Sequence, residues 1–484
     1  MVFTGSFFLF VFFPVSLGAY YLSVCLQKKI RLFERLRLSD WALVAVSLVF
    51  YGWTAWDGIA WLIGYVFLVY LLGRVIAGMP GKTAAGLLAT LCCVLTVGLT
   101  LLYFKYYNFA VTNLNRLFGS EISLLSLAAP LGISFITFSA ISYFVDIYRR
   151  DAKPGSFLDT ALYLTFFPKV ISGPIVLWKD FSKNLMRENR KADSSRILWG
   201  INRMIIGFSK KVILADTLGA LVAQIQSNAA VGIDLPTAWG AAFCYMLQIY
   251  YDFAGYSDIA LGLAAMFGFS FEENFCFPYC SCSITEFWRR WHISLGRWFR
   301  EYLYIPLGGN RKGKNRTLCN LFIVFLVTGF WHGAGWNYIL WGVVNGICIV
   351  AERCVRDKSW YQKIPKVIKW AATMLIVLFS WQIFRLNGMS EIARYFGMMT
   401  GIVRCETIDF TWQYYFDGRI ILLMLIGTVG ATLFHSQKLK AAVEKAQKNP
   451  VLFCIMQLGL FALGILSVMF MVNSTYSPFI YFQY

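Results

Sequence analysis

The amino-acid sequence predicts an all-α polytopic integral membrane protein with about 11–12 transmembrane helices. Hydrophobic residues make up 58% of its 484 residues and charged residues only 14%, so the chain carries more apolar surface than one soluble core could bury. Apolar runs of roughly 16 to 30 residues recur along it, and each can cross or nearly cross a hydrocarbon core of about 30 Å. No segment has the composition of a separate soluble domain. We therefore expect residues 1–484 to form a single transmembrane domain.

The distribution of charge predicts the orientation of these spans. The chain has 44 Lys and Arg against 25 Asp and Glu, and the basic residues cluster in short loops between apolar runs. This pattern is typical of cytoplasmic loops, so the excess positive charge does not indicate nucleic-acid binding. Residues 27–38 hold five basic residues against Glu34, which places this loop in the cytoplasm and the N-terminus outside.

Five spans are predicted in the first third of the chain. The first apolar run has no basic residue before it and no convincing small-residue cleavage site, so we expect a retained span and not a signal peptide. Five crossings return the chain to the cytoplasm at the basic sequence "RRDAKPG". The spans lie near residues 2–26, 41–56, 58–78, 84–104 and 125–148.

Residues 157–178 are predicted to form a broken re-entrant segment. Basic loops flank them on both sides, so a simple crossing would leave one of these loops outside. The run contains Pro168, Lys169, Gly173 and Pro174, and proline interrupts a helix. Irregular backbone at membrane depth is tolerated only where it packs in protein or lines a cavity, so we expect this segment to shape a cavity.

Seven further spans are predicted in the rest of the chain. The basic loop at residues 270–316 is expected in the cytoplasm, and residues 387–418 are expected outside. The spans lie near residues 197–225, 236–269, 317–332, 336–352, 370–386, 419–435 and 450–473.

Residues 286–302, "EFWRRWHISLGRWFREY", are predicted to form one amphipathic helix at the cytoplasmic interface. On a helical wheel the arginines fall outside an apolar stripe about 100° wide. His292, one of only three histidines in the chain, lies at the edge of this stripe and is expected to face inward. Because ionisable groups turned toward a membrane interior are costly and usually functional, His292 is a candidate site residue. The stripe consists of Trp288, Trp291, Leu295, Trp298, Phe299 and Tyr302.

His332 is the second candidate, in the sequence "TGFWHGAGWNYILWG" at residues 328–342. It ends an apolar run, and the glycines at 333 and 335 let the backbone turn and let another group approach closely. A tight hairpin with a packing histidine is the alternative. A histidine with open space around it is the better candidate for a general base. If a cavity joins His332 to His292, a group supplied on the inner face of the membrane could be used on the outer face.

The span near residues 236–269 carries buried polar candidates. Gln248, Asp252 and Tyr256 follow one another at four-residue steps and share one face. A carboxylate here needs a partner, which Lys210, Lys211 or a loop arginine could supply, so a structural ion pair and a catalytic role both stay open. His435, the third histidine, is interpreted as a helix-terminal residue.

Several other classes of site find no support in the sequence. It contains no phosphate loop, GxSxG elbow or zinc signature, and the cysteines of "FCFPYCSC" fit no metal-site spacing, so no metal site is predicted. The loop "PLGGNRKGKNR" at residues 306–316 is basic enough to attract an anionic donor, such as a coenzyme diphosphate or an acidic carrier protein.

Four long segments resemble the membrane-bound O-acyltransferase family, specifically its bacterial alginate O-acetylation branch. They are "PLGISFITFSAISYFVDIYR", "YYDFAGYSDIALGL", "EFWRRWHISLGRWFREYLYIPLGGNRKG" and "GFWHGAGWNYILWG". The likeness is densest over residues 130–350, which we expect to be the catalytic core. The resemblance implies many helices around a central tunnel.

The resemblance also implies roles for particular residues. His332 matches the family histidine required for acyl transfer, whereas His292 occupies a second motif in which many eukaryotic relatives have asparagine. Both are therefore candidate catalytic residues, and the role of His332 is the more secure. Candidate substrate-binding or tunnel-lining residues are Trp291, Trp331, Asp252, Tyr256, Asn337, Arg289 and Arg290.

The resemblance further implies a donor, partners and a location. The donor would be a cytoplasmic thioester, acetyl-CoA or an acyl carrier protein, with no tightly bound cofactor. The acyl group would pass outward to a cell-surface polysaccharide, through an extracytoplasmic acetyltransferase or a polysaccharide-synthesis complex. The protein would lie in the lipid bilayer of the bacterial inner membrane.

Three alternatives remain at this level. A sister branch of the family moves D-alanine from a carrier protein toward teichoic acid. A transporter could use the histidines as proton relays in a broken-helix core. A catalytically silent assembly subunit would tolerate substitution of both histidines.

Overall fold

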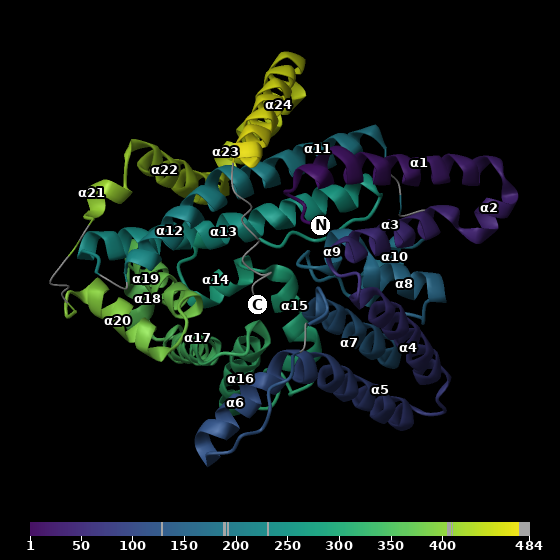
Figure 1. The fold of residues 1–484 in the computed structure, drawn as a ribbon, viewed down its shortest axis with the longest axis horizontal. Helices are drawn as coiled ribbons and strands as arrows, with labels where there is room; N and C mark the ends of the chain where they lie inside the picture. Colours follow the sequence, from purple (N-terminus) through teal and green to yellow (C-terminus); the bar gives the residue numbers. More distant parts are fainter. Residues whose placement is uncertain are drawn as a thin grey trace. The chain divides into compact units, whose positions relative to one another are not determined.

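A computed structural model describes residues 1–126, 129–186, 190, 193–229, 232–403, 408 and 410–473, and these residues form helices and connecting segments without a β-strand (Figure 1). The predicted all-α class is therefore confirmed for the described part of the chain. The chain divides into two compact units, Met1–Met204 with Tyr256–Glu272, and Ile205–Gly255 with Glu273–Tyr484. Two helices belong partly to each unit, α11 (Ser194–Ser209) and α13 (Leu235–Met266).

The first unit contains helices of 16 to 21 residues, α1, α3, α4, α5 and α7, together with several shorter helices. Its helix α7 lies against α4 and α5, and α3 lies against α1 and α8. The elements are η1 (Phe8–Phe12), α1 (Phe13–Lys29), α2 (Arg31–Leu36), α3 (Leu38–Thr54), α4 (Gly58–Gly78), α5 (Lys82–Val97), η2 (Gly98–Tyr106), α6 (Tyr107–Phe118), α7 (Ile133–Arg149), α8 (Phe157–Thr165), α9 (Phe167–Val170) and α10 (Trp178–Asn184).

The predicted broken segment is confirmed. Residues 171–177 are not helical and separate α9 from α10. Protein groups satisfy this irregular stretch, since the Tyr163 hydroxyl donates to the Val176 carbonyl at 2.9 Å and the Trp178 amide donates to Ser142 Oγ at 2.8 Å. Lys169 is buried within it, where its Nζ donates to Ser139 Oγ at 3.1 Å and lies 4.3 Å from the centre of the Tyr163 ring. The segment is thus enclosed in protein, and its re-entrant position in the membrane stays a prediction.

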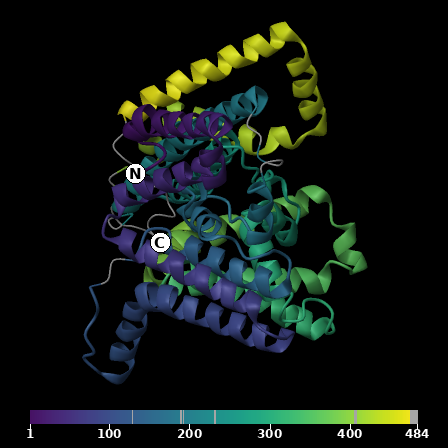
Figure 2. The ribbon, with the colours of Figure 1, turned by 90° about the vertical axis from the view of Figure 1, so that its right-hand side faces the viewer.

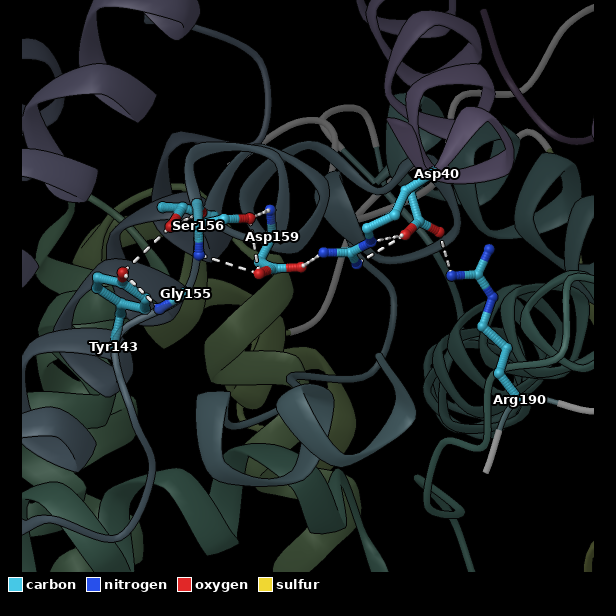
Figure 3. Close-up of polar contacts among 8 residues, drawn as sticks. Asp40, Tyr143, Gly155, Ser156, Asp159 and Arg190 are labelled. Carbon is cyan, nitrogen blue, oxygen red and sulfur yellow. Dashed lines mark hydrogen bonds and ion pairs between the residues drawn. The ribbon is translucent and has the colours of Figure 1, made fainter. Parts of the chain in front are cut away.

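A charged network ties the starts of α3 and α8 together in the first unit (Figure 3). Arg37 pairs with Asp40 and with Asp159, each at 2.6 Å. Asp159 also completes a capping box with Ser156 at the N-terminus of α8, and Asp40 pairs with Arg190. Each carboxylate therefore has a cationic partner, so the network can be buried in part without leaving an unpaired negative charge.

The second unit contains the segments that carry both candidate histidines. Its closest helix pair is α16 and α17, and α17 also packs against α19 and α14. In Figure 2 the yellow helix α24 follows α23, to which it is joined at Asn449. The elements are η3 (Lys210–Ala215), α12 (Asp216–Asn228), η4 (Pro278–Cys280), α14 (Ile284–Arg290), α15 (Ile293–Phe299), η5 (Arg300–Tyr304), α16 (Lys314–His332), α17 (Trp336–Val355), α18 (Ser359–Lys363), α19 (Lys366–Arg385), α20 (Met389–Thr400), α21 (Trp412–Tyr415), α22 (Gly418–Thr432), η6 (Leu433–His435), α23 (Gln437–Lys448) and α24 (Pro450–Asn473).

Seven helices of the described residues are long and apolar enough to cross a membrane, which makes this a multi-pass membrane protein. The spans predicted at 58–78 and 450–473 have the observed ends. The prediction for 84–104 is too short, because the helix runs from Lys82 to Phe118 through a π-helical stretch. Its last part carries Asn and Arg residues that hydropathy assigns to a loop. The total number of crossings remains a prediction.

Candidate functional site

The hairpin of α16 and α17 places His332 at its turn. The two helices approach so closely that a Cβ on Gly329 would lie 2.4 Å from the Tyr338 carbonyl oxygen. A Cβ on Gly333 would lie 2.2 Å from the Tyr338 ring. Because real side chains cannot approach to these distances, glycine is required at both positions if the turn is to keep its shape. The two glycines therefore determine the shape of the turn and, with it, the position of His332.

Aromatic rings surround His332, which is 6% exposed. Its imidazole centre lies 4.8 Å from the Trp331 ring, 5.0 Å from Trp341 and 5.0 Å from Phe384. Asn337 is also buried beside it, and its Nδ2 donates to the Phe384 carbonyl at 3.3 Å. The shell keeps bulk water from the imidazole, and Asn337 links the start of α17 to the end of α19.

His292 does not lie in the middle of a helix, which corrects the prediction of one amphipathic helix over residues 286–302. Helix α14 ends at Arg290 and α15 begins at Ile293, and His292 between them has φ +46°. The helical wheel failed because residues distant in the sequence take the hydrogen bonds at the break. The Cys276 amide donates to the Arg290 carbonyl at 3.0 Å, and the Ile293 amide donates to the Asn274 carbonyl at 2.9 Å.

The break turns His292 into the protein, where it is 3% exposed, so its predicted inward orientation is confirmed. Its Nδ1 lies 3.0 Å from Asn274 Oδ1, and its ring packs edge-on against Phe253 at 4.6 Å. Because Oδ1 also accepts from the Ser294 amide, it is the amide oxygen and Nδ1 must donate to it. The lone pair therefore lies on Nε2, which is buried without a hydrogen-bond partner. Burial lowers the pKa of His292 to about 3, so its imidazole is neutral near pH 7.

An aromatic cluster connects the two histidine segments within the second unit. Trp291 lies 4.7 Å from Trp381, and Trp288 lies 5.4 Å from Trp341, between ring centres. Trp341 in turn contacts His332. The residues predicted from "WRRWH" and "FWHGAGWNY" thus belong to one continuous group of packed rings.

The two arginines of "WRRWH" do not belong to this aromatic cluster. Arg289 is exposed, and Arg290 pairs with Glu286 at 2.6 Å. Arg290 also lies 3.3 Å from His435 Nδ1, and His435 ends the short helix η6, as the sequence predicts. These contacts hold the C-terminal end of α14, where Arg290 lies. Its N-terminus is held by Glu352 of α17, whose Oε2 accepts from the Ile284 amide at 2.6 Å.

The predicted partner of Asp252 is identified as Lys211. Lys211 Nζ lies 2.7 Å from Asp252 Oδ1 and 2.5 Å from Asp216 Oδ1, and its side chain is 4% exposed. Lys211 sits in the π-helical turn η3, a distortion that is frequent at functional sites. Tyr256, on the same helix as Asp252, belongs to the first unit and stacks on Phe3 at 4.8 Å.

Two residues of interest escaped the sequence reasoning. Asn274 orients His292 but lies in a loop with no pattern of its own. Arg385 ends α19, and its buried guanidinium lies over the rings of Tyr245 and Tyr395 at 5.4 and 4.9 Å, with no carboxylate partner among the described residues. The sequence does hold a signal for Arg385. It lies at the end of a span that is predicted to face outside, where the positive-inside rule disfavours a basic residue.

The described residues hold no group of three or more His, Cys, Asp or Glu side chains placed to bind a metal ion. Cys276, Cys280 and Cys282 are free thiols.

Comparison with known proteins adds an independent line of evidence. The sequence profile of the membrane-bound O-acyltransferase family matches residues 48–399. A probable alginate O-acetylase AlgI of Pseudomonas putida is 41% identical over 412 residues, 82% of this chain and 80% of that protein. The peptidoglycan O-acetyltransferase of Helicobacter pylori is 33% identical over 430 residues, 83% of this chain and 80% of that protein. A teichoic acid D-alanyltransferase of Streptococcus thermophilus is 33% identical over 251 residues, which cover 49% of this chain and 59% of that protein.

Proposed function

The chain belongs to the membrane-bound O-acyltransferase family, and we propose that it moves an acetyl group from a cytoplasmic thioester across the membrane for O-acetylation of a polysaccharide. Two relatives match this chain over 80% of their own length, and they are named as a probable alginate O-acetylase and a peptidoglycan O-acetyltransferase. The D-alanyl-transferring relative matches only half of this chain. Acetyl is therefore the acyl group that the comparisons favour.

The observation that carries the proposal is the setting of His332, a buried imidazole at a glycine turn inside an aromatic shell. In the proposed step, the neutral imidazole accepts the proton of the acceptor hydroxyl while the hydroxyl oxygen attacks the thioester carbonyl carbon. The new C–O bond forms as the C–S bond breaks, and the proton passes to the departing thiolate. The products are an O-acetyl ester and a free thiol. Excluding water from the shell protects the thioester from hydrolysis.

His292 is assigned a role on the donor side. Its Nε2 lone pair is held by the Nδ1 hydrogen bond to Asn274, and its segment joins the aromatic cluster that reaches His332. We place the thioester between these segments, in the central tunnel that the family implies. Arg385 supplies a buried cation at the end of α19, next in the chain to Phe384, and we expect it to meet an anionic group of the acceptor.

The donor and location follow from the same orientation. The basic loops predict a cytoplasmic entrance, so acetyl-CoA is the proposed donor and the bacterial inner membrane the proposed location. An extracytoplasmic acetyltransferase is the proposed partner that receives the acetyl group or completes its transfer to the glycan.

The test compares His332→Ala with His435→Ala, which removes an imidazole at a helix end remote from the glycine turn. Each variant is expressed in cells that lack the wild-type gene, and the O-acetyl content of the polysaccharide is measured together with the amount of protein in the membrane. Loss of a general base predicts a decrease in transfer of about 10²–10⁴-fold for His332→Ala. His435→Ala should retain transfer within about twofold.

Two results would overturn the proposal. One is unchanged polysaccharide acetylation in His332→Ala cells whose membranes contain the variant at the wild-type level. The other comes from membrane vesicles offered labelled donors: transfer from a D-alanyl carrier protein, with none from acetyl-CoA, would replace the acetyl donor by its sister-branch alternative.

A further inference from the structure

An open pocket of about 1090 Å³ lies within the first unit, at the ends of three apolar helices. Its walls are the last turn of α4, the first turn of α5, the last turn of α7, the loop of residues 150–155 and α10. The basic loops of the sequence predict that these helix ends face the cytoplasm. The pocket is therefore expected where the membrane surface meets the cytoplasm, and neither His292 nor His332 is among its lining residues.

The lining of this pocket is strongly basic. Seven Lys and Arg residues line it against two carboxylates, Asp151 and Asp159. Both carboxylates are already paired, Asp159 (labelled in Figure 3) with Arg37 at 2.6 Å and Asp151 with Lys179 at 3.9 Å. Lys82, Arg150 and Lys153 form no ion pair with a described carboxylate. The pocket thus has positive charge to spare for an anion.

Arg150 gives a second indication. It ends α7 in the left-handed region, at φ 64° and ψ 23°, a conformation that glycine adopts freely and arginine only at a cost. Arg37 shares this left-handed conformation and lines the same pocket. Strained residues that persist at a cavity point to a use for their side chains. Both of these residues are arginines, so each adds a positive charge to the pocket lining.

Part of the remaining lining is apolar and comes from the ends of three helices. Ile76, Met79 and Ala85 lie at the ends of α4 and α5, beside Ile147 of α7. A soluble phosphate compound would leave this apolar surface exposed to water. A phospholipid offers a phosphate for the basic residues and acyl chains for the apolar surface. Basic pockets between transmembrane helices on the cytoplasmic side are suited to anionic headgroups. We propose that the pocket binds the headgroup of an anionic phospholipid, with its phosphate among Lys82, Arg150 and Lys153.

The test measures lipid retained by the full-length protein. The protein is purified in mixed micelles of phosphatidylglycerol and phosphatidylcholine, and bound lipid is counted by native mass spectrometry. We expect wild type to retain phosphatidylglycerol in preference to phosphatidylcholine, and the triple variant K82Q/R150Q/K153Q to retain at least tenfold less. The control K438Q/K440Q/K445Q removes the same charge from helix α23 and should retain the wild-type amount.

Folding and the nature of the phosphate are controlled separately. Arg150→Gly relieves the left-handed strain, so it should lose phosphatidylglycerol without lowering the thermal midpoint. Coenzyme A added to wild type should leave the bound phosphatidylglycerol in place. The proposal is overturned if the triple variant retains phosphatidylglycerol like wild type, or if coenzyme A displaces the lipid, which would make a soluble phosphate compound the occupant.

Discussion

Removing the buried ion pair between Lys211 and Asp252 tests whether Asp252 has a structural or a catalytic role. Lys211 lies between two carboxylates, at 2.5 Å from Asp216 and 2.7 Å from Asp252, and the side chains of Lys211 and Asp252 are only 4% and 2% exposed. Substitution of Lys211 by Met keeps the length of the side chain and removes its charge. Both carboxylates then lose their ammonium partner, Asp252 at 2% and Asp216 at 12% side-chain exposure.

The expected cost is large. Removing one partner of a buried ion pair costs about 3–5 kcal/mol, because the other charge stays buried without compensation. At about 1.4 kcal/mol per tenfold change, this shifts the unfolding equilibrium by two to nearly four powers of ten. Asp252→Asn should cost less, about 1–2 kcal/mol, because Lys211 keeps Asp216 and the amide oxygen still accepts a hydrogen bond. The double variant should be more stable than the sum of the two costs predicts.

The assay is unfolding of the purified protein in detergent micelles, followed by tryptophan fluorescence, together with acetyl transfer. The exposed Lys438→Met provides the control and should unfold like wild type. The reasoning is refuted if Lys211→Met is as stable as wild type. If Asp252→Asn keeps wild-type stability but loses transfer a hundredfold, Asp252 acts in the chemistry and not in an ion pair.

Three further predictions concern the site and its surroundings. Between pH 7 and 5 the unfolded chain takes up a proton on His292, but the folded protein does not, because the pKa of the buried imidazole is about 3. The free energy of unfolding should therefore fall by about 2 kcal/mol more in wild type than in His292→Gln. An equal dependence of the unfolding temperature on pH in the two proteins would contradict this. Gly333→Ala places a Cβ 2.2 Å from the Tyr338 ring and should destabilise by about 1–3 kcal/mol and lower transfer, whereas Gly64→Ala, with open space around it, should be neutral. Arg385→Gln should reduce transfer at least tenfold through a higher apparent KM for the acceptor, with Arg385→Lys intermediate; an unchanged KM would remove Arg385 from the acceptor site.

Much of the helix layout could be predicted from the sequence. Apolar length and flanking charge identify a span without reference to the rest of the chain, which is why 58–78 and 450–473 have the observed ends. The prolines and glycine of 157–178 predict a broken segment for the same local reason. The hairpin around His332 follows from spacing, and the cost of a buried charge predicts that Asp252 has a cationic partner. Only the structure selects Lys211 among the candidates Lys210, Lys211 and a loop arginine.

Only the tertiary structure decided how the candidate site is assembled. Residues 286–302 have the periodicity of one helix, yet the chain breaks at His292 because the backbone of residues 274–276 bonds to the peptide groups on either side. Asn274 determines which imidazole nitrogen is free, and no local pattern announces it. Arg385 and the basic pocket are likewise products of packing, since each gathers groups from helices far apart in the chain. Periodicity reports the preference of a segment for a membrane or an interface, whereas a site depends on which distant groups satisfy one another's hydrogen bonds and charges.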